Sequence, residues 1–312
     1  MQSKETPWHP PNVLMQLRLH HPPYVSFPIV YRARRNFRIF VNEQHLIAMK
    51  TFHIIPAALL LTLLGAASCK RSETVISTYE NQVEQKLEQS DSAGVTVIQS
   101  IEYLESIEGG KSLCSKVNNL VVKFCFGDSY DGYELRPASE DYAASLVDDY
   151  KKDAGMTFDE DSEAYWAYNW SYLMTGRFSD SYGDLQTYTV YCENYLGGAH
   201  GMQSMIPHVI NLRTGEEVTE EEFFAEGYEE PVAGLIREAL QKEWGSPDDP
   251  SSTYCMMEED GMVPNGFYGV SEEGVTWYYQ PYVIASYAQG VIEAKVPWYQ
   301  LKPYISKEYS KF

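Results

Sequence analysis

Two different hydrophobic periods alternate along the second half of this chain. In segment 231–244, apolar residues recur every three or four positions and Gly245 follows, which predicts an amphipathic helix that starts at a proline. In segments 165–174 and 185–195, large apolar residues occupy alternate positions, which predicts two strands joined by a turn near 179–184. Helices and hairpin-like strands are therefore mixed along the chain.

The same reasoning places the other elements. A strand is predicted at 95–104, a helix with one apolar face at 113–124, and a second helix at 140–153 capped by Ser139. The remaining predicted elements are a strand at 204–212, a short helix opened by the capping box Thr219–Glu222, strands at 275–279 and 291–296, and a short helix near 298–304. Residues 70–93 are polar and are expected to form a tether with some helix. The predicted fold class is α+β, as two lobes with largely antiparallel sheets and packed helices.

An export signal precedes these elements. Met49 and Lys50 are followed by an apolar run over 54–64 and by small residues up to Cys69. This layout is typical of a secretory signal, and the run is shorter than the roughly 20 apolar residues of a membrane-spanning helix. The segment Leu64–Cys69 resembles the bacterial lipobox, which implies that the Cys69 thiol is lipidated after cleavage before it. The alternative is an ordinary signal that happens to contain a cysteine.

Residues 1–48 are rich in His, Pro, Arg and aromatic residues and show no clear period. Because a signal acts at the start of a chain, we expect a start assigned too early, with Met49 as the true beginning. The alternative is a small cytoplasmic part followed by a membrane span. Four arginines within 32–38 fit the cytoplasmic side, whereas Lys70 and Arg71, just beyond the run, oppose that orientation.

The charge of the exported part is strongly negative. The chain has 24 basic and 44 acidic residues, and residues 1–68 hold seven basic and two acidic ones. The rest therefore has 17 basic and 42 acidic residues, a net charge of about −25. Such a surface repels nucleic acid and anionic membranes and attracts basic partners, although acidity often serves solubility alone. The 25 tyrosines favour a folded domain over an acidic tail.

Four cysteines follow Cys69, at 114, 125, 192 and 255, and they allow three disulfide pairings. Cys114 and Cys125 lie on nearly the same face of the predicted helix, three turns apart, which is too far for a bond between them. No Cys-x-x-Cys pair and no histidines at zinc spacing occur in the sequence. We therefore expect no metal site and no cofactor.

The segment Tyr191–Gly201 reads Tyr-Cys-Glu-Asn-Tyr-Leu-Gly-Gly-Ala-His-Gly and resembles the characteristic motif of the RsiV-like extracellular domain family. Further similar segments follow in order, at 211–215, 218–224, 274–279, 282–290 and 296–301. The family includes the sensor part of a lysozyme-binding anti-sigma factor and an accessory part of a peptidoglycan deacetylase. The resemblance covers roughly 94–307 and implies two α+β lobes. The expected organisation is an extension or mis-assigned start at 1–48, a signal at 49–68, a tether at 69–93, and lobes at 94–201 and 202–312.

His200 is the strongest candidate for chemistry because it lies among glycines that leave the backbone open to a ligand. A catalytic partner would have to be Ser204, Glu193 or Cys192, and His208 is the partner for a metal pair. No Gly-x-Ser-x-Gly elbow and no His-Glu-x-x-His pair occurs in the sequence. The structural alternative is that the glycines shape a tight turn and His200 bonds a backbone group to fix it.

These observations predict a non-enzymatic lipoprotein of the bacterial cell envelope, held on a membrane through Cys69. Its domain is expected to bind a protein or a cell-wall glycan, and the resemblance suggests lysozyme. The ligand-binding candidates are Gly197, Gly198, His200 and Gly201, with no catalytic residue and no nucleic acid partner. One alternative is a cell-wall glycan hydrolase that uses His200 and nearby acids. The other is a membrane-spanning anti-sigma-type sensor, and the lack of a catalytic motif favours binding.

Overall fold

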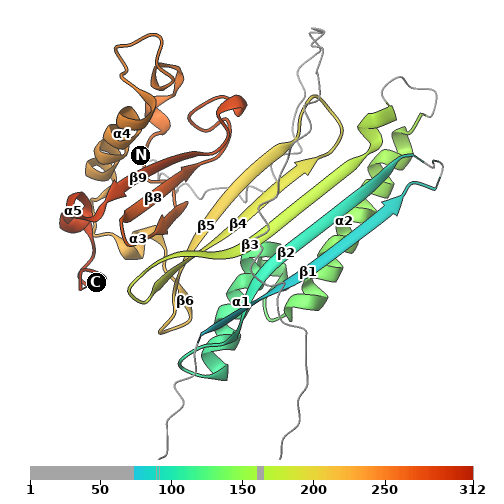
Figure 1. The fold of residues 1–312 in the computed structure, drawn as a ribbon, viewed down its shortest axis with the longest axis horizontal. Helices are drawn as coiled ribbons and strands as arrows, with labels where there is room; N and C mark the ends of the chain where they lie inside the picture. Colours follow the sequence, from blue (N-terminus) through green and yellow to red (C-terminus); the bar gives the residue numbers. More distant parts are fainter. Residues whose placement is uncertain (1–73, 89, 91, 160–164, 312) are drawn as a thin grey trace, which may run out of the picture. The chain divides into compact units, whose positions relative to one another are not determined.

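Six strands form the first sheet of the computed structural model, which describes residues 74–88, 90, 92–159 and 165–311. The strands lie in chain order and are β1 (Val75–Lys86), β2 (Gly94–Ser106), β3 (Trp170–Tyr182), β4 (Leu185–Tyr195), β5 (Met202–Asn211) and β6 (Glu216–Glu217). Neighbouring strands are antiparallel except for β2 and β3, which run parallel (Figure 1). The first sheet is therefore mixed.

Two helices connect the parallel pair and cover one face of the first sheet. Helix α1 (Lys111–Phe126) packs on β2, β3 and β4, and α2 (Leu135–Thr157) packs on β1 and β2 (Figure 1). A parallel pair needs such a crossover, because a tight turn returns the chain antiparallel. Alternate residues of β2, such as Val95, Val97 and Ile101, are buried under the helices. The period of two seen in the sequence therefore marks the face that the helices cover.

Strand β1 corrects one expectation. Residues 70–93 are polar and were expected to be a tether with some helix, but residues 75–86 form the edge strand of the first sheet. Its inward positions include Ser77, Asn81 and Gln85, which are only half buried. Because these positions are mostly polar, the strand lacks the hydrophobic alternation that would have marked it.

Helix α2 corrects a second expectation, the cap at Ser139. It begins at Leu135, so Ser139 lies inside the helix and does not cap it. Ser139 is buried, and its hydroxyl donates to Gln99 Oε1 at 2.6 Å. Asn81 Nδ2 donates to the same oxygen at 2.8 Å. Ser139 therefore serves as a hydrogen-bond partner for polar groups of β1 and β2. A serine in this role cannot be distinguished from a helix cap by the sequence alone.

A second, antiparallel sheet consists of β7 (Tyr268–Val270), β8 (Gly274–Tyr279) and β9 (Ile292–Pro297). Helix α4 (Glu229–Trp244) packs against β9, and α3 (Glu220–Phe223) and α5 (Trp298–Leu301) complete this region. The short 3-10 helices of the described residues are 128–130, 165–168, 254–256, 259–261, 287–289 and 302–304. The predicted capping box at Thr219–Glu222 is confirmed, with both of its hydrogen bonds present.

The second sheet packs on β4 and β5, on the face of the first sheet that α1 and α2 do not cover. Thr187 Oγ1 donates to the Val270 carbonyl at 2.8 Å, and the Val270 amide donates back to Thr187 Oγ1. The side-chain amide of Gln280 makes two similar bonds to the backbone of Met205. The expected boundary at Gly201 falls inside the β4–β5 hairpin, because β5 and β6 still belong to the first sheet.

The α+β class and the two sheets are confirmed. The extension at 1–48, the signal at 49–68 and Cys69 lie outside the described residues. Among the helices of the described residues, none combines the length and the hydrophobicity of a membrane span. The four cysteines after Cys69 are all unpaired thiols, so none of the three pairings is present.

Candidate functional site

The glycine-rich turn between β4 and β5 needs its glycines for different reasons. Gly197 has a φ of 74°, and a Cβ there would lie 2.2 Å from the Ala167 carbonyl oxygen. Gly198 has a φ of 137° and open space around it. A Cβ on Gly201 would lie 2.6 Å from the Asn194 carbonyl oxygen. Positive φ is costly for residues with a side chain, so backbone conformation and close packing together select glycine in this turn.

His200 projects from this turn and is exposed. Its Nδ1 lies 2.7 Å from the Gly201 carbonyl oxygen, which can only accept, so Nδ1 carries the hydrogen. The imidazole stacks on the Tyr287 ring at a centroid distance of 4.1 Å and an interplanar angle of 21°. The Tyr282 hydroxyl lies 3.4 Å from Nε2. We call His200, Tyr282 and Tyr287 the ring cluster.

Tyr282 holds its place in the ring cluster at a conformational cost. Its φ is 71°, and among the described residues it is the only non-glycine residue with a positive φ. A hydrogen bond from its amide to the Ala285 carbonyl at 3.0 Å closes the turn that imposes this conformation. The side chain is 57% exposed, so burial of the ring does not account for the strain. Such strain tends to occur at functional sites.

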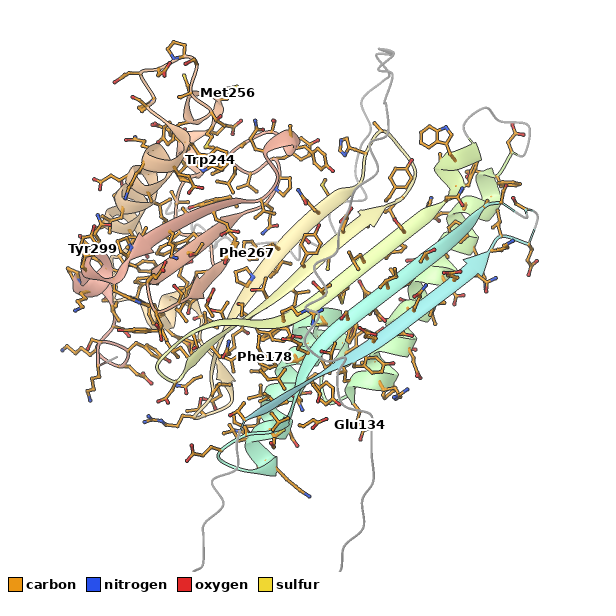
Figure 2. The ribbon with its side chains drawn as sticks, viewed as in Figure 1. Glu134, Phe178, Trp244, Met256, Phe267 and Tyr299 are labelled. Carbon is orange, nitrogen blue, oxygen red and sulfur yellow. The ribbon has the colours of Figure 1, made fainter. Side chains whose placement is uncertain are left out.

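Exposed apolar residues adjoin the ring cluster in the chain. Leu196 adjoins the glycine turn and Val283 adjoins the strained tyrosine in the chain, and both are exposed. The loop 256–263 is held against the same region by a hydrogen bond from the Glu258 amide to the Ile284 carbonyl at 2.8 Å. The two ends of this loop, Met256 (labelled in Figure 2) and Val263, are also exposed apolar residues. These residues add exposed apolar area on the segments that carry the ring cluster and on the loop bonded to one of them.

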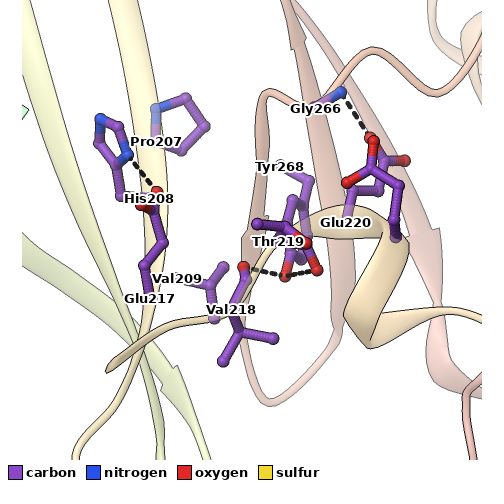
Figure 3. Close-up of a pocket in the computed structure, with 10 residues that line it drawn as sticks. Pro207, His208, Val209, Glu217, Val218, Thr219, Glu220, Gly266 and Tyr268 are labelled. Carbon is purple, nitrogen blue, oxygen red and sulfur yellow. Dashed lines mark hydrogen bonds and ion pairs between the residues drawn. The ribbon is translucent and has the colours of Figure 1, made fainter. Parts of the chain in front are cut away.

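A second feature is a cavity of about 180 Å³ between β5, α3 and β7 (Figure 3). At one side His208 Nδ1 donates to Glu217 Oε1 at 2.8 Å, and the imidazole stacks on Phe124 with centroids 3.7 Å apart. At the other side lies Glu220, which is 2% exposed. The cavity therefore has polar groups that already have partners within the protein.

Glu220 joins three segments of the second region. Its Oε1 accepts from Trp277 Nε1 at 2.7 Å, and its Oε2 accepts from the Gly266 amide. Burial raises the pKa of its carboxyl to about 7, although these N–H donors act in the opposite direction. Because both oxygens serve to tie α3, β8 and the turn at 266 together, we interpret Glu220 as a structural group.

All four predicted ligand-binding residues lie in the β4–β5 turn, as their neighbouring positions in the chain require, and His200 has different partners from those considered for catalysis. Glu193 accepts from the Tyr191 hydroxyl at 3.0 Å, and Cys192 pairs in register with Ser204 across β4 and β5. The contacts of His200 are instead with Gly201, Tyr282 and Tyr287. His208 bonds Glu217, and the described residues contain no group of three side chains able to hold a metal ion.

Sequence reasoning missed the two tyrosines of the ring cluster. Tyr282 and Tyr287 lie 82 and 87 positions beyond His200, and nothing local in the sequence relates them to it. The signal that was available is the segment 282–290, which belongs to the family resemblance but was given no role. The positive φ of Tyr282 has no sequence signature, because a turn of this kind usually selects glycine or asparagine.

Comparison with known proteins finds one family model that matches part of the chain and solved structures with a similar fold. Residues 221–299 match the family model described as "protein of unknown function (DUF3298)". A crystal structure of a DUF3298 family member from Bacteroides fragilis NCTC 9343 is similar with a TM-score of 0.67 and 17% identity, covering 76% of this chain and 95% of that one. A DUF3298 family protein from Pseudomonas aeruginosa PAO1 gives a TM-score of 0.48 and 15% identity, with coverage of 76% and 95%. No curated protein matches the chain.

Proposed function

We propose that this chain is an envelope lipoprotein whose folded domain is a non-enzymatic binding module for a basic protein. The observation that carries this proposal is the exposed ring cluster with its strained member Tyr282. Tyrosine is enriched in protein interfaces because its ring offers a large contact area with little loss of conformational entropy. An exposed ring held in place at a cost to the backbone fits a contact surface better than it fits a core.

Charge supports a basic partner. The part of the chain after residue 68 has a net charge of about −25, and opposite charges raise association rates. Lysozyme is strongly basic and is the partner suggested by the family resemblance. A cell-wall glycan is the other partner expected from the sequence, since sugar faces also pack on aromatic rings. The two are distinguished by the experiment below.

Anchoring supports a position in the envelope. The lipobox-like segment ends at Cys69, and β1 begins at Val75, so only residues 70–74 separate the proposed lipid from the folded domain. Five residues span at most about 18 Å when fully extended. The proposed module is therefore held close to the membrane that carries its lipid.

The test measures binding by biolayer interferometry at about physiological ionic strength, where surface charge is screened over roughly 8 Å. Lysozyme, a second protein of equal positive charge and a peptidoglycan fragment are compared. We expect lysozyme to bind and to lose affinity on Tyr282→Asn but not on Tyr299→Asn. Tyr299 is a matched control, since it is an exposed tyrosine of α5 outside the ring cluster (Figure 2).

Equal binding of both basic proteins would mean that charge alone drives association, and it would contradict specific recognition of lysozyme. Binding of peptidoglycan alone would transfer the proposal to the glycan. Loss of affinity in both tyrosine variants, or in neither, would contradict the ring cluster as the contact surface. Hydrolysis of the peptidoglycan fragment that disappears with His200→Ala would favour the glycan hydrolase instead.

A further inference from the structure

Two segments carry the ring cluster and a third is hydrogen-bonded to one of them, and together they carry charge of one sign. Segments 191–205, 256–263 and 280–291 contain four carboxylates and no lysine or arginine. The carboxylates belong to Glu193, Glu258, Glu259 and Asp260, and all four residues are exposed. The charge of these segments is therefore negative, which disfavours anionic ligands and favours cationic ones.

The ring cluster offers what a cation needs beyond charge. His200 and Tyr282 are exposed, so their rings are accessible to a partner. Aromatic faces attract cations, and arginine more often than lysine, because the planar guanidinium stacks on a ring while its edges still donate to carboxylates. Lysine brings a strongly hydrated point charge that cannot stack in this way.

The protein itself contains this combination at another place on its surface. Arg136 lies over the Tyr79 ring with its Cζ 5.2 Å from the centroid. The same guanidinium pairs with Glu140 at 3.9 Å. A ring and a carboxylate thus hold one arginine at an exposed position. The segments at the ring cluster also contain rings and carboxylates, but these segments have no arginine of their own.

We infer that the ring cluster recognises an arginine side chain displayed by its protein partner. The guanidinium stacks on the Tyr282 ring, and carboxylates of segments 191–205 and 256–263 accept its hydrogen bonds. This inference rests on the proposed binding function and names the chemical group that the site takes. It makes arginine, rather than positive charge in general, the determinant of recognition.

The test is isothermal titration calorimetry of the full-length protein in detergent against a peptide of six arginines and a peptide of six lysines, at about physiological ionic strength. We expect the arginine peptide to bind about tenfold more tightly than the lysine peptide. Tyr282→Asn should abolish this preference, whereas Tyr282→Phe, which keeps the ring, and Tyr299→Asn should retain it. Glu258→Gln should weaken both peptides to a similar extent, because it removes charge and leaves the rings.

Equal affinities of the two peptides, or a preference that survives Tyr282→Asn, would overturn the inference. Circular dichroism of each variant confirms that loss of the preference is not loss of the fold. Failure of this inference can be distinguished from failure of the proposed function. If lysozyme binding depends on Tyr282 but the arginine preference is absent, the ring cluster is a contact surface for another feature of the partner. If the preference is present but no basic protein binds, the partner class is wrong.

Discussion

Glu220 allows a quantitative test of the structure, because its buried carboxyl should couple stability to pH. Its pKa rises from an ordinary value of 4.5 to about 7 in the folded protein. Between these values the folded state holds one proton more than the unfolded state. The free energy of unfolding therefore decreases by about 1.4 kcal/mol for each pH unit, since each unit of pKa corresponds to about 1.36 kcal/mol. The contribution is complete below pH 4.5 and is lost as the pH rises through 7, a total of about 3 kcal/mol.

The perturbation is Glu220→Gln, which keeps the size of the side chain and removes the titration. Other carboxyl groups also change stability with pH, so the quantity to measure is the difference between the wild type and the variant. Urea unfolding at pH 4.5, 5.5, 6.5 and 7.5 gives this difference. We expect the advantage of the wild type to fall by about 3 kcal/mol across the series. Glu221→Gln is the matched control, because it removes a neighbouring but exposed carboxyl from the same short helix.

A difference that does not change with pH would show that Glu220 has the same proton affinity folded and unfolded. A difference that grows with pH would show that the N–H donors of Trp277 and Gly266 outweigh burial and lower its pKa. Either result would refute the assignment of burial as the dominant effect at this carboxyl.

Four further predictions concern the turn, the strained tyrosine and the cysteines. Gly197→Ala should cost about 3 kcal/mol of unfolding free energy and Gly198→Ala about 1 kcal/mol, since only the first adds a clash to the strained φ; equal losses in chemical denaturation would contradict this. Tyr282→Asn should keep the melting temperature or raise it by about 3 °C, because asparagine tolerates a positive φ; a large decrease would argue against backbone strain. Native alkylation followed by mass spectrometry should modify the exposed Cys255 well before Cys125, whose pKa burial raises to about 12. Cys69→Ser should abolish incorporation of labelled palmitate and leave an uncleaved precursor, and a wild type that takes up no label would disprove lipidation.

Much of the fold could be predicted where the pattern was strong. Helix α4 has an apolar face every three or four residues, and large apolar residues occupy alternate positions along much of β3 and β4. The helix and this pair of strands were therefore predicted, although β3 begins later, at Trp170, and continues to Tyr182. Strand β1 was not found, because α2 covers it with a polar contact through Ser139. The parallel pairing of β2 with β3 also escaped prediction, since it depends on how α1 and α2 pack together and not on any local period.

The candidate site was predicted only in part. The glycines of the β4–β5 turn could be recognised in the sequence, because their close spacing indicates an unusual backbone conformation. The rings that meet His200 do not, because their proximity depends on the packing of the second sheet against β4 and β5. The hydrogen bonds between Thr187 and Val270 and between Gln280 and Met205 fix that packing. Contacts of this range are a property of the tertiary structure, and no single segment carries them.

The ring cluster joins two turns that are 82 residues apart in the chain. If the β4–β5 turn gained or lost a residue, His200 would no longer reach Tyr282 and Tyr287, and the same holds for the turn that bears the tyrosines. The two turns therefore form one unit, because the ring cluster exists only when both turns have their present length. The family model begins at residue 221 and includes the tyrosines but not His200, so a survey of relatives restricted to that segment would follow only half of this unit.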